Sequence, residues 1–345
     1  MIRFVTATSL IALAGCPPKS SAPVQNPQLT GAGCPAASGV FIASYLTQDA
    51  GKGRTGWVLP MAALKAESTA ADYQPIDMTT AQASGVPAAP AGNLWLLAGA
   101  TPCQVRIGSA YAAKVDASLS YGYELDNCPP PQDPQEGTGV VIVSQEPPNG
   151  CTFDQPKPVA DRLGTMDDKK QWKAPGAGTP IPPALQSALP THECAAPNCE
   201  PLWAIASIES NQQPVAWAGA LNWLQVGDPA KPCDWKAERF SGFFIPGADG
   251  KAIQVTEGQD PKRPLALSAA LVDKSGAHVL IAEGPGEYAT YDLTPGKATL
   301  GHHTQWMLAG DEEWEAYDHL GPVCEPEPTP PAPMPKDAKP QSPYP

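Results

Sequence analysis

The sequence predicts a mainly β protein, with an α+β fold as the alternative, built from two related antiparallel modules that are braced by disulfides. Most apolar segments are short, rich in β-branched and aromatic residues, and bounded by glycine or proline, which is typical of antiparallel strands. Several of these segments recur in the same order in the two halves of the chain. The 43 prolines and 31 glycines among 345 residues indicate folded modules joined by proline-rich connections.

The first element is an apolar segment at residues 4–14, preceded by one positive charge at Arg3. It is too short to cross a bilayer as a helix, which needs about 20 apolar residues. Its length and its charged flank are typical of the core of a signal peptide. We therefore expect residues 1–15 to be removed on export, with an ordinary secretory peptide as one form of this signal.

The end of this segment, Leu13-Ala14-Gly15-Cys16, resembles the lipobox of bacterial lipoproteins. The resemblance covers only these first sixteen residues. It implies that a diacylglyceryl group, with fatty acids such as palmitate, is attached to the sulfur of Cys16 and that a dedicated peptidase cuts just before it. Two or three acyl chains give stable anchoring at a membrane. Because Pro17 and not aspartate follows, the resemblance further implies the outer membrane, facing the periplasm or the exterior.

Residues 16–36 are rich in proline, serine, glycine and alanine, and we expect them to form a flexible tether. A first β-rich module, residues 37–145, follows. It opens with a strand, GVFIASYL, a hairpin loop, and a returning strand, WVLPM. A short helix is expected near residues 61–65, and further strands are expected at residues 93–99, 120–125 and 139–144.

Residues 146–200 are predicted to be a linker rich in proline and glycine, with one short helix at about residues 183–189. In the second module, residues 201–324, the segments LWAIASIE, VAWAG, LNWLQVGDPAKPC and GAHVLIAEG match GVFIASYL, TGWVLP, NLWLLAGATPC and GTGVVIVSQ in the same order. This order predicts a duplicated module. A closing strand is expected at residues 304–311, a helix at 310–321, and a disordered, proline-rich tail at 325–345.

The chain has nine cysteines, an odd number for an exported protein. Setting Cys16 aside as the lipid site leaves eight, which suffice for four disulfides in an oxidising compartment. If the modules share a fold, equivalent cysteines form equivalent bonds, and the predicted pairs are Cys34–Cys103, Cys199–Cys233, Cys128–Cys151 and Cys194–Cys324. A local Cys194–Cys199 bond is the alternative, and a zinc site there would lack a second close pair of ligands.

Two polar patterns are candidate sites. The segment GKGRTG at residues 51–56 has the spacing of a dinucleotide-binding loop, but a strand and not a helix follows it, so we expect a hairpin turn. A metal or acid–base cluster is the second pattern, but adjacent histidines point to different sides of a strand, which favours a solvated acidic surface. Its members are His302, His303, Asp311, Glu312, Glu313, Glu315, Asp318 and His319.

Eight of the nine tryptophans are candidates for a carbohydrate or peptidoglycan platform. Their recurrence at matched strand positions favours a place in the core. They are Trp57, Trp95, Trp203, Trp217, Trp223, Trp235, Trp306 and Trp314.

The net charge of −13 and the lack of any basic run exclude nucleic acid as a partner. No motif of a serine hydrolase, zinc protease, EF-hand or P-loop occurs, so the sequence assigns no catalytic residue, metal or cofactor. The sequence favours a membrane-anchored, non-enzymatic protein that binds an envelope protein or a glycan. An exported hydrolase or metal-dependent enzyme with an unrecognised site is the alternative.

Overall fold

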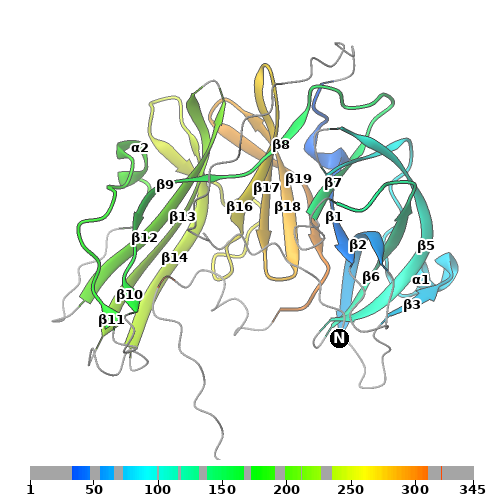
Figure 1. Ribbon diagram of the computed structural model, residues 1–345, viewed down its shortest axis with the longest axis horizontal. Helices are drawn as coiled ribbons and strands as arrows, with labels where there is room; N and C mark the ends of the chain where they lie inside the picture. The colour runs from blue at the N-terminus through cyan, green and yellow to red at the C-terminus, as the bar shows by residue number, and fades with distance from the viewer. Residues whose placement is uncertain are drawn as a thin grey trace, which may run out of the picture.

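The structure, a computed structural model, is described for residues 33–46, 55–65, 73–98, 101–115, 118–131, 138–166, 172–190, 199–210, 212–226, 235–309 and 320. This part of the chain is mainly β with antiparallel pairing, as the sequence predicts. Figure 1 shows three β layers side by side, with a barrel on the right, a sheet in the centre and a second sheet on the left. The predicted signal segment, nearly all of the tether and of the 310–321 helix, and the tail lie outside the described residues.

The N-terminal layer has seven strands, β1 (Val40–Leu46), β2 (Gly56–Lys65), β3 (Tyr73–Ile76), β4 (Leu94–Leu97), β5 (Cys103–Val115), β6 (Ser118–Asp126) and β7 (Thr138–Val143). Six of them close into a barrel in the order β5-β4-β7-β1-β2-β6, because β6 pairs again with β5. The long β5 pairs along its other edge with β4 near its start and with β3 further along.

Side chains along the barrel strands alternate between its inside and its outside. On β1, Phe41 and Ala43 belong to the barrel core, whereas Val40 and Ile42 belong to a second apolar cluster outside it. The short helix α1 (Met78–Ala83) is capped at its N-terminus by Asp77, whose carboxylate accepts a hydrogen bond from the backbone N–H of Thr80 at 2.8 Å. The barrel thus has its own core and an apolar outer face.

The central sheet is buried on both faces. Its strands are β8 (Thr152–Asp154), β16 (Ala266–Asp273), β17 (Gly276–Gly284), β18 (Glu287–Thr294) and β19 (Lys297–Gln305). On β17, Val279 and Ile281 pack against the outer face of the barrel, and the alternate residues Leu280 and Ala282 pack against the second sheet. Burial on both faces explains why this strand reads as a continuous apolar run.

The second sheet contains β9 (Lys157–Arg162), β12 (Cys199–Ser210), β13 (Gln213–Val226), β14 (Trp235–Pro246) and β15 (Ala252–Gln254). Its outer face carries Trp217 and Phe244, which pack with Leu185 of the short helix α2 (Pro183–Gln186). A separate pair of short strands, β10 (Thr165–Met166) and β11 (Trp172–Lys173), follows β9.

Several predicted elements are confirmed. Strands occur at the predicted positions of β1, β2, β4, β6, β7, β12 and β17, and the β1–β2 hairpin is present. Helix α2 lies within the predicted helix at 183–189. The GKGRTG segment is followed by the strand β2, as expected.

Other predictions are wrong. Residues 61–65 continue β2 and form no helix. The described residues of the region 146–200 include four complete strands, α2 and the start of β12, and two of the complete strands, β8 and β9, are edge strands of the two sheets. The expected closing strand at 304–311 ends at Gln305 in β19. Residues 146–200 have the composition of a linker because β8 and β9 are short and flanked by prolines. The partner strands of β8 and β9 lie far along the chain, so no local pattern indicates the pairing.

The pairing of the strands is not duplicated. In the barrel, GVFIASYL (β1) pairs directly with the GTGVVIVSQ segment (β7). Their counterparts in the second half, β12 and β17, lie in different sheets. The NLWLLAG segment forms a strand of its own, β4, whereas its counterpart LNWLQV is the second half of β13. The matched segments therefore do not occupy equivalent places in the fold.

Candidate functional site

The described part of the chain contains two complete disulfides, Cys34–Cys151 and Cys103–Cys128. The predicted pairs Cys34–Cys103 and Cys128–Cys151 are therefore wrong. The prediction assumed two equivalent modules, whereas the barrel geometry decides the pairing. Cys103 opens β5 and Cys128 follows β6, its antiparallel neighbour, so the two cysteines lie at the same end of that pair.

The remaining cysteine predictions involve residues outside the described part. Cys199 at the start of β12 is disulfide-bonded. Its predicted partner, Cys233, and the predicted pair Cys194–Cys324 lie outside the described residues, as does Cys16, the predicted lipid site.

The Cys34–Cys151 bond belongs to a larger set of contacts that hold the first described residues of the chain. We call this set the N-terminal clamp; it comprises Cys34, Ala37, Cys151, Thr290, Asp292 and Gly301. Ala37 opens a single 3-10 turn, η1 (Ala37–Gly39), that lies against β18 and β19. The backbone N–H of Ala37 donates to Asp292 Oδ1 at 2.7 Å, and Thr290 Oγ1 donates to the carbonyl of Ala37 at 2.9 Å. Both polar groups of this buried residue are thus satisfied by side chains of β18.

Close packing completes the clamp. A Cβ atom placed on Gly301 of β19 would lie 2.4 Å from the Cβ of Ala37 and 2.7 Å from its carbonyl carbon, so only glycine allows η1 to approach this strand. Immediately after η1, the ring of Phe41 meets that of His302 edge-on, with 4.6 Å between the ring centres. Two effects lower the pKa of His302: burial of its imidazole, which is the larger, and the electrostatic effect of the neighbouring His303.

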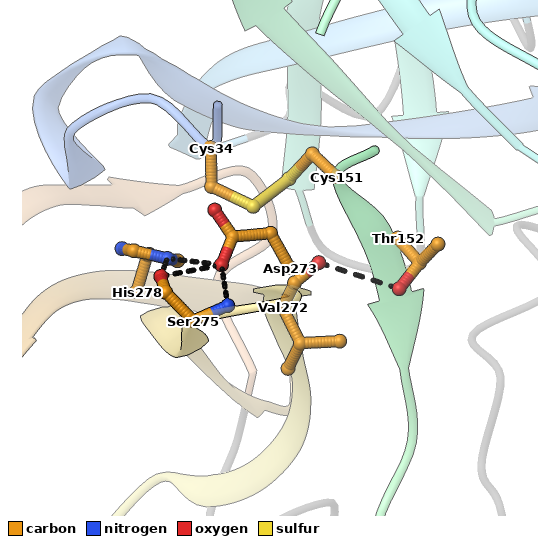
Figure 2. The surroundings of a disulfide bond; sticks show 7 residues. All are labelled: Cys34, Cys151, Thr152, Val272, Asp273, Ser275 and His278. Atoms are coloured by element: carbon orange, nitrogen blue, oxygen red, sulfur yellow. Dashed lines mark hydrogen bonds and ion pairs between the residues drawn. A yellow bond between two sulfur atoms is a disulfide. The ribbon is translucent and has the colours of Figure 1, made fainter. Parts of the chain in front are cut away.

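Figure 2 shows that a polar turn lies beside the disulfide. Asp273 and His278 flank the tight hairpin between β16 and β17. Ser275 Oγ donates to Asp273 Oδ1 at 2.6 Å, and His278 Nε2 lies 2.8 Å from the same oxygen and 3.0 Å from Ser275 Oγ. Burial raises the pKa of Asp273, but hydrogen bonds from Ser275 and His278 outweigh it and lower the value to about 2.

This serine, histidine and aspartate are not arranged as a hydrolase triad. In a triad the aspartate and the serine bind opposite nitrogens of the imidazole ring. Here Asp273 and Ser275 both face Nε2 of His278, and the backbone N–H of Ser275 also donates to Asp273 at 2.7 Å. That pattern closes the hairpin turn, and it leaves the serine without a separate base.

A shallow groove of about 390 Å³ adjoins the N-terminal clamp. Its lining is mostly apolar and comes from the segment after Cys34, from the loop before β4 and from the end of β7. The lining residues are Pro35, Ala36, Ser38, Gly39, Phe41, Pro90, Ala91 and Val143. No local sequence pattern indicates this groove, because its three segments are distant along the chain.

The histidine and acid pattern, for which the sequence favours a solvated surface over a metal or acid–base cluster, does not assemble into a cluster within the described residues. His302 points to Phe41 and Tyr288, whereas the adjacent His303 lies 3.1 Å from Glu287, so the two rings diverge as expected for a strand. The acidic residues and His319 of that pattern lie outside the described residues. Within the described ranges, no group of three or more His, Cys, Asp or Glu is placed to hold a metal ion.

The tryptophans that the structure describes lie mainly in the core, as expected. Four are buried, namely Trp57, Trp217, Trp223 and Trp306. Trp95 and Trp203 are half-buried, and each indole N–H donates to a backbone carbonyl, of Ser144 at 3.1 Å and of Thr179 at 2.9 Å. The side chains of Trp235 and Trp314 lie outside the described part.

One titratable group that the sequence did not single out lies in the central sheet. Glu283 of β17 is paired in register with Tyr288 of β18. Burial raises the pKa of Glu283 to about 7, although a hydrogen bond with Ser268 acts in the opposite direction. Burial likewise raises the pKa of Tyr288 to about 12. By its accessible surface the Glu283 side chain is half-buried, and the local sequence of β17 does not indicate this environment, because it arises from strand pairing and sheet packing.

Comparison of the chain with protein-family models, with curated proteins and with solved structures finds no match. Within the described ranges, neither helix is of a length and apolar character that would cross a membrane.

Proposed function

We propose that this protein is an exported lipoprotein, anchored to a membrane of the cell envelope through Cys16, whose rigid β body binds a partner in that envelope. The observation that carries the proposal is the apolar segment at residues 4–14, closed by Leu13-Ala14-Gly15-Cys16. The cysteine lies eighteen residues before Cys34, where the N-terminal clamp begins.

The spacing between the two cysteines suits a tether. Eighteen residues reach at most about 60 Å when fully extended, and as a flexible coil they span about 25 Å on average. The body is therefore held near the lipid surface, yet free to turn. We propose the outer membrane, facing the periplasm or the exterior, as the location.

The uses of the polar clusters support a non-enzymatic function. Asp273 and Ser275 close a hairpin turn, and Asp292 and Thr290 hold the backbone of Ala37. These groups are employed in holding the fold. We propose an envelope protein or a glycan as the partner.

Lipidation is tested with labelled palmitate in a bacterial host that expresses the full chain. We expect the native protein to take up the label, to lose residues 1–15 and to sediment with membranes. Cys16→Ala should remain an unprocessed precursor without label, whereas Pro17→Ala, its matched control, should remain labelled. Labelling of Cys16→Ala would contradict the proposal.

Binding is tested by affinity capture of the lipidated protein from its own membranes. We expect an envelope protein or a glycan to co-purify, and to be absent from captures made with an unrelated lipoprotein. Recovery of the protein without either would refute the binding function.

A further inference from the structure

The barrel begins and ends on neighbouring strands. The chain enters it at Val40 on β1 and leaves it at Val143 on β7, and these strands are antiparallel partners. Their register pairs Val40 with Ile142, so the entry and the exit lie at the same end of the pair. A pull on the chain before Val40, resisted by the chain after Val143, therefore separates two ends that lie side by side.

This loading geometry is mechanically weak. Force that separates the paired ends of two antiparallel strands acts on one residue pair at a time, as in a zipper, so the ladder offers little combined resistance. The β1–β7 ladder contains five register pairs from Val40↔Ile142 to Ser44↔Thr138. In front of it, two side-chain hydrogen bonds hold the backbone of Ala37 to β18.

The Cys34–Cys151 disulfide lies across the open end of this zipper. It joins the chain before β1 to the chain after β7, with 5.1 Å between the two Cα atoms. The loop that it closes spans 117 residues and contains every strand of the barrel. Cys151 leads directly into β8, where Thr152 pairs with Val272 of the central sheet and donates to its carbonyl at 3.3 Å.

We propose that the Cys34–Cys151 disulfide is a mechanical latch, which passes tension from the N-terminal tether to the central sheet and keeps the barrel out of the load path. The inference rests on the proposed function, because a lipid anchor and a bound partner supply the opposing forces. Tension that arrives at Cys34 crosses the sulfur bridge to Cys151 and enters β8. The β1–β7 ladder then carries no load.

Single-molecule stretching tests the latch on the chain from residue 17 to residue 345, held by tags at its two ends. We compare the native protein with the double variant Cys34→Ser, Cys151→Ser. The variant should unfold to a length about 300 Å greater, because the latched loop becomes extensible except for the part that Cys103–Cys128 closes. This added length should appear as the first step and at the lowest force.

A matched control uses the second disulfide. Cys103→Ser with Cys128→Ser removes a bond that lies inside the latched loop, so the stretched length should equal that of the native protein. Release of the added length in the native protein would overturn the proposal. Release of the added length in the Cys34→Ser, Cys151→Ser variant only after the sheets have unfolded would also overturn the proposal, because the barrel would then resist force without the disulfide.

A second measurement tests the latch on the native protein, and it remains valid if the double variant folds poorly. The native protein is held at constant force while a small thiol is added. The thiolate attacks one sulfur of the bond, forms a mixed disulfide with it and releases the other cysteine as a thiolate. A step of about 300 Å should follow reduction, and reduction of Cys34–Cys151 without this step would overturn the latch. Neither measurement involves lipid. A failure of palmitate labelling would therefore refute the membrane anchor without affecting the test of the latch.

Discussion

Gly301 decides how closely the N-terminal segment approaches β19. Substitution to alanine would place a methyl group in contact with the backbone of η1, which must then move away from Thr290 and Asp292. We expect Gly301→Ala to lower the free energy of unfolding by about 1 to 3 kcal/mol, measured by urea denaturation. Gly176→Ala is the control, since no atom lies within 4 Å of its added Cβ. Equal unfolding midpoints for the two variants would contradict this account of the clamp.

Glu283 should make stability depend on pH. Its folded-state pKa is about 7, above the usual value of 4.5, so the folded protein binds the proton more tightly than the unfolded chain does. The associated stability is fully present below about pH 4.5 and is lost as the pH rises through about 7.

The measurement is the free energy of unfolding from pH 4 to pH 8 for the native protein and for Glu283→Gln. The difference between the two curves isolates this carboxyl from His302, whose lowered pKa acts in the opposite sense as the pH falls. We expect the native protein to lose on the order of 2 kcal/mol relative to the variant across this range. Parallel curves would show that Glu283 is ionised in the folded protein as it is in the unfolded chain.

The two disulfides that lie wholly within the described residues close loops of different size. Cys34–Cys151 spans 117 residues and Cys103–Cys128 spans 25. By chain entropy, their removal as pairs of alanines should cost about 5 and about 3.5 kcal/mol, respectively. Guanidinium denaturation of the two double variants tests the order, and a larger loss for the shorter loop would mean that local strain or packing outweighs loop size.

Strand propensity explains which elements the sequence predicts well. β1, β7 and β17 are rich in valine, isoleucine and leucine, so the sequence predicts the positions of these three strands correctly. β5 was missed because its second half, GSAYAAKV, is rich in small residues that favour no strand locally. Those small residues are required by the barrel, where Ala110 and Ala112 face a crowded interior.

At the scale of the whole molecule, the central sheet joins the barrel to the second sheet through two apolar interfaces. The barrel therefore carries apolar residues on its outside as well as its inside. Val40, Ile42, Val140 and Ile142 all face the central sheet. A barrel separated from that sheet would expose a contiguous apolar surface of the kind that drives association.

A fragment of residues 33–151 tests this arrangement. We expect it to bind a hydrophobic dye and to self-associate in ultracentrifugation, because its outer face has lost its partner. The same fragment with Ile42→Thr and Ile142→Thr should bind less dye and self-associate less. A monomeric native fragment without dye binding would contradict the layered core.

The arrangement of these layers could not be predicted from the sequence. Short-range patterns indicate where strands occur, but the partners of β8 and β9 lie about 120 and 40 residues further along the chain. The clamp is non-local as well, because Ala37 meets Thr290 and Asp292 across more than 250 residues. The one site that the sequence alone allows to be proposed is Cys16, because its resemblance to a lipobox rests on the contiguous residues Leu13-Ala14-Gly15-Cys16.

The nesting of one disulfide inside the other bears on how the protein would mature if it is exported as we propose. A chain that emerges N-terminus first presents Cys34, then Cys103, and only later Cys128 and Cys151. Oxidation in order of emergence joins Cys34 to Cys103 and Cys128 to Cys151, which is not the native connectivity. Thiol–disulfide exchange corrects such pairs through mixed disulfides, in seconds to hours. Biogenesis of this protein should therefore depend on a disulfide isomerase in its compartment, and not on an oxidase alone.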